Sequence, residues 1–170
     1  MKTIKRMMAL WLCMVCCLSI EAAQVERKQL FNDGWTFWLG DEATASTVGF
    51  DDASWRTLTL PHDWSIEHDF DVKYPSGNDG GYVMTGVGWY RKSFLVPSNM
   101  VDKRLSLYFE GVYMNSEVFV NGQSVGKRPY GYSSFIYDIT PYVKVGEQNV
   151  VAVRVDNSKQ RNCRWYTGAG

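Results

Sequence analysis

The stretch EVFVNGQSVG, residues 117–126, restricts the possible folds of this chain more than any other sequence feature. Its centre, Asn121-Gly122, lies between two β-prone segments. This dipeptide readily adopts the positive φ angles that both central residues of a two-residue hairpin turn require. The stretch therefore predicts two antiparallel strands joined by a tight turn.

Short strands are predicted along most of the chain on either side of this hairpin. In RLSLYF, residues 104–109, two leucines and a phenylalanine alternate with a serine and a tyrosine, so one face of the strand is expected in the core. In NVVAVRVDN, residues 149–157, three valines alternate in the same way with Ala152, Arg154 and Asp156. Further β-prone runs occupy residues 35–39, 56–60, 89–96 and 133–140.

The number and spacing of these strands indicate the fold class. Seven to nine short strands with no helical pattern between them favour an all-β antiparallel β-sandwich of the jelly-roll type over any βαβ arrangement. Residues 23–170 are enough chain to bury one such core. Residues 63–88 are polar, glycine-rich and longer than a hairpin connection requires, and a loop of this length is usually functional or disordered.

The first 22 residues have the features of a secretory signal peptide. Lys2, Lys5 and Arg6 precede the apolar run MMALWLCMVCCLSI, which is too short to span a membrane comfortably. The small residues Ala22 and Ala23 follow, and we expect cleavage between them. The mature chain is therefore expected to be secreted or periplasmic, with no membrane segment once the signal is removed. A buried first helix is disfavoured because the run has no polar face.

Charge and cysteine content exclude several classes of function. Removal of residues 1–22 leaves 15 basic and 17 acidic residues, a net charge of −2, so no nucleic-acid partner is implied. Three of the four cysteines lie in the signal peptide, which leaves Cys163 alone. Neither a disulfide framework nor a cysteine metal site is expected.

Four separated blocks carry a family resemblance. They are FDDASWRTLTLPHDW (50–64), GWYRKSF (88–94), FEGVYMNSEVFVNGQSVGKRPYGYSSFIYDITPYV (109–143) and RWYTGAG (164–170). In this order they resemble the N-terminal sugar-binding domain of family-two glycoside hydrolases of the β-galactosidase type, over roughly residues 28–170. The resemblance implies that an immunoglobulin-like domain and a (β/α)₈ barrel with two catalytic glutamates follow. Residues 23–170 are then expected to be a front domain, truncated at its C-terminus, that lacks both.

No catalytic residue is expected within the chain. Retaining glycoside hydrolysis requires two carboxyl groups about 5–5.5 Å apart, one of them with a raised pKa. Asp51 and Asp52 are expected in a solvated turn, where they cap local amides. Glu67 and Asp69 share one side of the long segment at strand spacing, but no apolar group is placed to raise either pKa.

A metal site or other cofactor is not expected either. His62 and His68, with Asp63 and Asp69 beside them, match no common ligand spacing. We expect the LPHDW motif to fix a strand end, with the His62 imidazole hydrogen-bonded to backbone.

Sugar contacts are the remaining candidate chemistry. Sugar rings stack on tryptophan and tyrosine, while their hydroxyl groups need polar partners, and NDGGY (78–82) and RNCRWY (161–166) combine both residue types. The resemblance implies that the candidate substrate-binding residues lie in these two segments. In residues 161–166, this chain differs from family members that have an acidic residue near the tryptophan. The five candidates are Asn78, Asp79, Asn162, Arg164 and Trp165. In RPYGYSSF (128–135), we expect a strand crossover in which Gly131 permits the turn and Phe135 enters the core.

The expected function is that of a non-catalytic front domain of a secreted β-galactosidase-like glycosidase. It would support the barrel and help to bind the terminal sugar of a carbohydrate substrate. The alternatives are the front domain of a β-glucuronidase or β-mannosidase, a free-standing carbohydrate-binding module, and an adhesion or protein-interaction sandwich.

Overall fold

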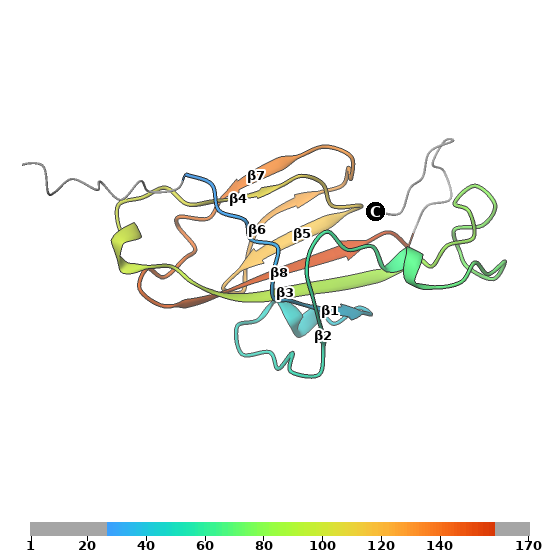
Figure 1. Cartoon of the computed structure of the whole chain (residues 1–170), viewed down its shortest axis with the longest axis horizontal. Helices are drawn as coiled ribbons and strands as arrows, with labels where there is room; N and C mark the ends of the chain where they lie inside the picture. The colour runs from blue at the N-terminus through green and yellow to red at the C-terminus, as the bar shows by residue number, and fades with distance from the viewer. Residues whose placement is uncertain (1–26, 159–170) are drawn as a thin grey trace, which may run out of the picture. The chain divides into compact units, whose positions relative to one another are not determined.

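A computed structural model describes residues 27–158 (Figure 1). The chain divides into two compact units, Met1–Phe31 and Asn32–Gly170. The described part of the first unit, residues 27–31, has no regular secondary structure. All described strands belong to the second unit, and no helix between residues 27 and 158 is long and apolar enough to cross a membrane.

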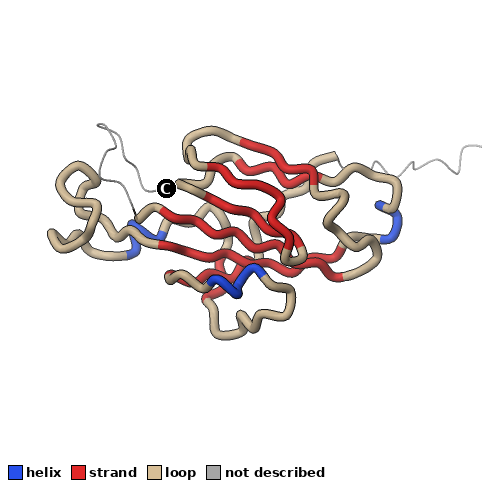
Figure 2. The backbone as a smooth tube through the Cα atoms, turned by 180° about the vertical axis from the view of Figure 1, so that it is seen from behind, coloured by secondary structure: helices blue, strands red, loops and turns tan. Residues whose placement is uncertain are grey.

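The second unit is built from antiparallel strands, which confirms the predicted all-β fold (Figure 2). One sheet has six strands in the order β2-β1-β3-β8-β5-β6, and a smaller sheet pairs β4 with β7. The strands are β1 (Trp35–Leu39), β2 (Arg56–Leu58), β3 (Val87–Leu95), β4 (Ser106–Phe109), β5 (Ser116–Val120), β6 (Gln123–Arg128), β7 (Phe135–Asp138) and β8 (Gln148–Asp156). Three short 3₁₀ helices are η1 (Ala43–Ser46), η2 (Trp64–Glu67) and η3 (Ser98–Met100).

The β5–β6 hairpin has the predicted turn. Asn121 and Gly122 have φ angles of 50° and 81°, so both central residues are left-handed. The Asn121 side chain also donates to the Tyr142 carbonyl at 2.8 Å and to Asn149 Oδ1 at 2.7 Å. These two hydrogen bonds tie the turn to the connection between β7 and β8 and to the start of β8, so the hairpin is held by more than its own ladder.

The small sheet packs over one face of the large sheet. Tyr137 of β7 lies against Gly126 of β6, where a Cβ atom would be 2.3 Å from the tyrosine ring. The Arg128 guanidinium at the end of β6 lies over the Phe135 ring at 5.9 Å. Beneath this layer lie fully buried valines of the neighbouring strands β5 and β8, namely Val118, Val120 and Val151. The two sheets therefore form the predicted sandwich.

The other face of the large sheet is also covered, which the alternation in β8 did not indicate. Ala152 points away from Val151, Val153 and Val155 and yet is only 1% exposed. It belongs to a core cluster with Trp89, with Ala45 of η1 and with Trp55 before β2. The segment that connects β1 to β2 covers this face, and β8 is consequently buried on both sides.

A buried arginine holds this covering segment in place. Arg91 of β3, only 3% exposed, donates from Nη1 to the Thr47 carbonyl at 3.0 Å and to the Ala45 carbonyl, and from Nε to Asp52 Oδ2 at 3.2 Å. Asp52 also accepts a hydrogen bond from Thr36 Oγ1 at 2.7 Å. The expectation that Asp52 is a solvated turn residue is therefore wrong, because it neutralises a buried cation. Asp51 does cap the amide of Ala53, at 3.0 Å.

Candidate functional site

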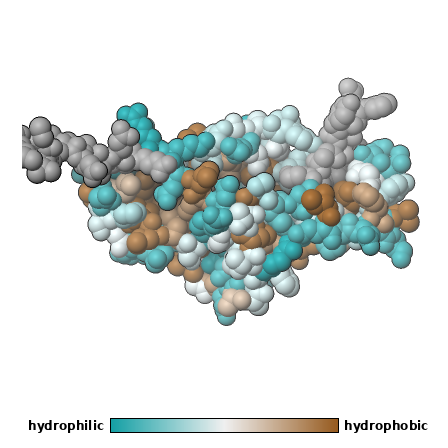
Figure 3. Space-filling view, in the orientation of Figure 1, coloured by the Kyte–Doolittle hydropathy of each residue, from teal (hydrophilic) through white to brown (hydrophobic). Residues whose placement is uncertain are grey.

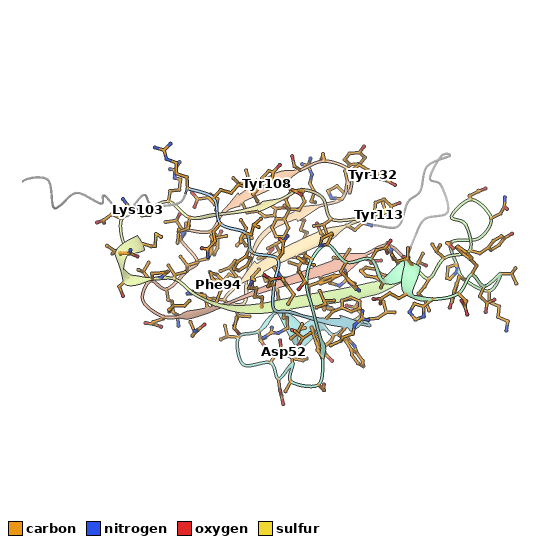
Figure 4. All side chains as sticks on the ribbon, in the orientation of Figure 1. Asp52, Phe94, Lys103, Tyr108, Tyr113 and Tyr132 are labelled. Carbon is orange, nitrogen blue, oxygen red and sulfur yellow. The ribbon has the colours of Figure 1, made fainter. Side chains whose placement is uncertain are left out.

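One end of the sandwich gathers several connections, and we call it the loop end. The pairing brings the start of β3 beside the end of β8, and the start of β5 beside the end of β6. The connections that meet there are residues 63–86, residues 110–115 and residues 129–134. Residues 63–86 are the green loop at the right of Figure 1, and Tyr113 and Tyr132 of the other two connections are labelled in Figure 4.

Residues 63–86 form an ordered loop in spite of their length. Asp63 Oδ1 accepts a hydrogen bond from the Ser65 amide at 2.8 Å and caps η2. The Ser65 hydroxyl, only 1% exposed, donates to the Met84 carbonyl at 2.7 Å, and the Ser76 hydroxyl donates to the Val83 carbonyl at 2.9 Å. These hydrogen bonds join the outgoing and returning halves of the loop.

The tip of the loop presents the two described candidate residues, Asn78 and Asp79, to solvent. Gly77 accepts from the amide of Tyr82 at 2.9 Å, and Asn78 accepts from the amide of Gly81 at 3.2 Å. Gly77 has a φ angle of 59° and Gly81 one of 73°, conformations that glycine adopts without strain. The amide and carboxylate groups are thus held on a turn with a defined backbone.

A buried asparagine fastens the base of this loop to the end of β8. Asn157 is 2% exposed, and its side-chain Oδ1 accepts a hydrogen bond from the Gly86 backbone amide at 2.8 Å. The backbone amide of Asn157 donates to the Gly86 carbonyl at 3.0 Å. The other three candidate residues, Asn162, Arg164 and Trp165, lie outside the described residues. The structure thus places Asn157, which precedes their segment in the sequence, at the base of the loop that carries Asn78 and Asp79.

Trp64 seats the start of the loop on the large sheet. Its ring stacks on Phe37 of β1 with the centroids 5.7 Å apart and the planes 18° apart. Gly88 of β3 makes room for it, because a Cβ atom there would lie 2.9 Å from Trp64 Cζ3. Trp64 Nε1 and Thr85 Oγ1 are buried and have no hydrogen-bond partner among residues 27–158.

His62 takes part in a network of side chains, so the expectation that its ring bonds to backbone is wrong. Its Nδ1 lies 2.8 Å from the Tyr90 hydroxyl, and its Nε2 lies 2.9 Å from Arg56 Nη2 and 3.2 Å from Glu67 Oε1. Arg56 also donates to Glu67 Oε2 at 2.7 Å. The network joins β2, η2 and β3 at the entrance to the long loop, which is the motif's expected structural role.

The electrostatics of this network do not suit acid catalysis. The hydrogen bond from Arg56 lowers the pKa of Glu67, against the smaller opposing effect of burial. A general acid at neutral pH requires the reverse shift. Burial raises the pKa of the Tyr90 hydroxyl, so this group stays protonated. Within residues 27–158, no group of three or more His, Cys, Asp or Glu side chains is arranged to hold a metal ion.

The crossover between β6 and β7 brings aromatic side chains to the loop end. Gly131 is required there because a Cβ atom would lie 2.5 Å from Tyr113 Cδ2 and 2.7 Å from Tyr113 Cα. Tyr113 and Tyr132 have ring centroids 5.2 Å apart, and Tyr130 and Tyr132 meet edge to face at 5.8 Å. The predicted crossover is confirmed. Phe135 is only half-buried, stacked on Phe109 at 4.9 Å.

Taken together, the loop end offers groups that suit a sugar. It combines an exposed amide and carboxylate at the loop tip with the half-exposed rings of Tyr130 and Tyr132. Asn157 and Ser65, which shape this end, were not identified from the sequence. Their partners lie 71 and 19 residues away, and no local pattern marks such pairs.

Comparison with known proteins assigns the family. Residues 28–169 match the model of the sugar-binding domain of the family 2 glycosyl hydrolases. The chain belongs to this family.

Several much longer proteins match this chain over part of their length. The β-galactosidase BoGH2A of Bacteroides ovatus is 54% identical over 91% of this chain, and a putative β-glucuronidase of Formosa agariphila is 47% identical over 88%. Among solved structures, a β-glycosidase from Bacteroides vulgatus matches 82% of the chain with a TM-score of 0.77 and 48% identity. The chain spans only 18%, 14% and 18% of the length of these three proteins, respectively.

Proposed function

We propose that this chain is the non-catalytic N-terminal domain of a larger retaining glycosidase that removes a terminal β-galactose from a carbohydrate. The observation that carries the proposal is the match of the sugar-binding domain family over residues 28–169. It is supported by the high identity to a β-galactosidase over nearly all of the chain. Two barrel glutamates outside this chain would act as acid/base and nucleophile.

In this proposal the domain supports the barrel and contributes polar groups to the sugar subsite. Asn78 and Asp79 would hydrogen-bond sugar hydroxyl groups from the loop tip. The segment that follows Asn157 would add Asn162, Arg164 and Trp165, whose amide, guanidinium and indole groups suit hydroxyl contacts and ring stacking. The hydrogen bonds between Asn157 and Gly86 support this joint role, because they keep the bases of the two segments together.

Glucuronic acid is the second candidate sugar. A putative β-glucuronidase shares 47% identity with this chain, and the Bacteroides fragilis β-glucuronidase shares 32%. The cationic Arg164 would suit the carboxylate of a glucuronide, whereas a galactoside offers it only hydroxyl groups.

The test compares hydrolysis of aryl β-galactoside and aryl β-glucuronide by two purified proteins. The first is the complete protein, meaning the natural polypeptide that contains this chain, and the second is residues 23–170 alone. We expect the complete protein to cleave the galactoside and residues 23–170 to cleave neither substrate. Preference for the glucuronide would select the second candidate. Cleavage by residues 23–170, with contaminating enzyme excluded, would refute the proposed non-catalytic role.

We also propose that residues 1–22 direct export and are removed between Ala22 and Ala23. N-terminal sequencing of the protein recovered from the periplasm or medium tests this proposal. Recovery of an intact N-terminus from the cytoplasm alone would contradict it.

A further inference from the structure

Three large apolar side chains on the long loop are turned into solvent. Ile66 in η2, and Phe70 and Val72 shortly after it, are each 79% exposed. We call these three residues the apolar strip. Figure 3 shows hydrophobic surface at the end of the molecule where this loop lies, with hydrophilic atoms around it. Contiguous exposed apolar surface marks interaction sites, whereas single exposed apolar residues do not.

The exposure of the apolar strip is built into the loop. In η2, Trp64 is buried against the sheet and Ser65 against the returning half of the loop, which leaves Ile66 on the outer side. After it, Asp71 donates its amide to the Tyr82 carbonyl at 3.1 Å, and its Oδ1 accepts from the Lys73 amide at 2.9 Å. The backbone between Phe70 and Val72 is therefore hydrogen-bonded to the returning half of the loop at Tyr82 and to the next turn at Lys73.

The charges beside the apolar strip describe its partner. Asp69 and Asp71 alternate with Phe70 and Val72 along the sequence, so carboxylates border the apolar groups. A complementary surface would be an apolar depression with lysine or arginine at its rim. Burial of three such side chains against that surface would favour the contact, because it removes apolar area from water.

We propose that the apolar strip is the contact surface for the part of the same polypeptide that follows Gly170. This inference rests on the proposed function, because it requires that further domains follow. Asn157 binds the base of the loop one residue before Ser158, the last described residue, so the continuing chain starts beside the loop. The relatives named above are more than five times longer than the segment matched here, which supplies an occupant of sufficient size.

Photocrosslinking of the complete protein tests the occupant directly. Phe70→p-benzoylphenylalanine places a photoreactive group in the apolar strip, and Val101→p-benzoylphenylalanine places it on a residue that is 68% exposed beyond η3, at the opposite end of β3. We expect the probe at position 70 to crosslink within one polypeptide to residues beyond 170, and the control to give no such product. A product of twice the monomer mass, or a yield at position 70 equal to that of the control, would overturn the proposal.

A matched pair of valine variants gives an independent readout. Val72→Asp should lower the thermal midpoint of the complete protein by roughly 2–4 °C, whereas Val101→Asp should leave it unchanged. Equal midpoints for both variants would count against the contact. If the wild-type protein hydrolyses a glycoside but the probe at position 70 gives no crosslink, this inference is refuted and the proposed function stands. If the probe crosslinks to residues beyond 170 but the protein hydrolyses neither glycoside, the contact stands and the proposed function is refuted.

Discussion

At the scale of single residues, close packing explains several side chains better than sequence pattern does. Gly131 has no unusual φ angle, and it is glycine because the Tyr113 backbone and ring leave no space for a Cβ atom. Arg91 is buried because carbonyl groups of the β1–β2 connection and the Asp52 carboxylate surround its guanidinium. Removal of one member of such a buried set leaves the others unpaired, which is costly.

Gly131→Ala tests the packing of the crossover. The new methyl group would collide with Tyr113, so we expect the free energy of unfolding to fall by about 1–3 kcal/mol. Urea denaturation of residues 23–170 measures the change. Gly49→Ala is the control, since a Cβ atom at that position meets nothing within 4 Å, and it should change stability by less than about 0.5 kcal/mol. Equal effects for the two variants would contradict the described geometry.

At the scale of secondary-structure elements, the strands were predictable and their cross-links were not. The run at 35–39 coincides with β1, and the Asn-Gly hairpin has its predicted turn, because alternation and turn chemistry are local properties. Pairs such as Asp52 with Arg91 join residues 39 positions apart, and no short-range pattern encodes them. The candidate residues at the loop tip came from the family resemblance, whereas the hydrogen bonds that hold that loop came only from the structure.

The network between β2, η2 and β3 predicts a pH-dependent stability. Because Arg56 lowers the pKa of Glu67 in the folded state, the ionised carboxylate stabilises the fold above its ordinary pKa of about 4.3. That contribution is lost as the pH falls through the lowered pKa. In thermal unfolding of residues 23–170, the wild-type midpoint should therefore be higher than that of Glu67→Gln at pH 6. The two midpoints should converge below pH ~4.

The control for this prediction is Glu147→Gln, in the exposed turn before β8. In this variant, the change in thermal midpoint between pH 6 and pH 3 should be close to the change in wild type. A constant gap between wild type and Glu67→Gln over the whole pH range would show that the carboxylate charge is not what stabilises the network.

At the scale of the whole molecule, the position of the loop tip predicts an effect on catalysis by other domains. Asn78→Ala and Asp79→Ala should each lower kcat/KM of the complete protein roughly tenfold, as expected when one hydrogen bond to a sugar hydroxyl is lost. Steady-state kinetics with the aryl glycoside that wild type prefers measures the change. Asn99→Ala and Asp102→Ala, exposed residues at the opposite end, should have no effect. Unchanged kinetics in all four variants would remove the loop tip from the sugar subsite.

The two hydrogen bonds between Asn157 and Gly86 have a practical consequence for protein engineering. Chimaeras that graft this module onto a foreign enzyme need a splice point, and the end of β8 at Asp156 is the obvious choice from strand boundaries alone. A junction there would replace Asn157 with the residue that the foreign enzyme has at that position, and the Gly86 amide would lose its hydrogen bond to Asn157 Oδ1. Fusions should instead retain the native sequence through Asn157.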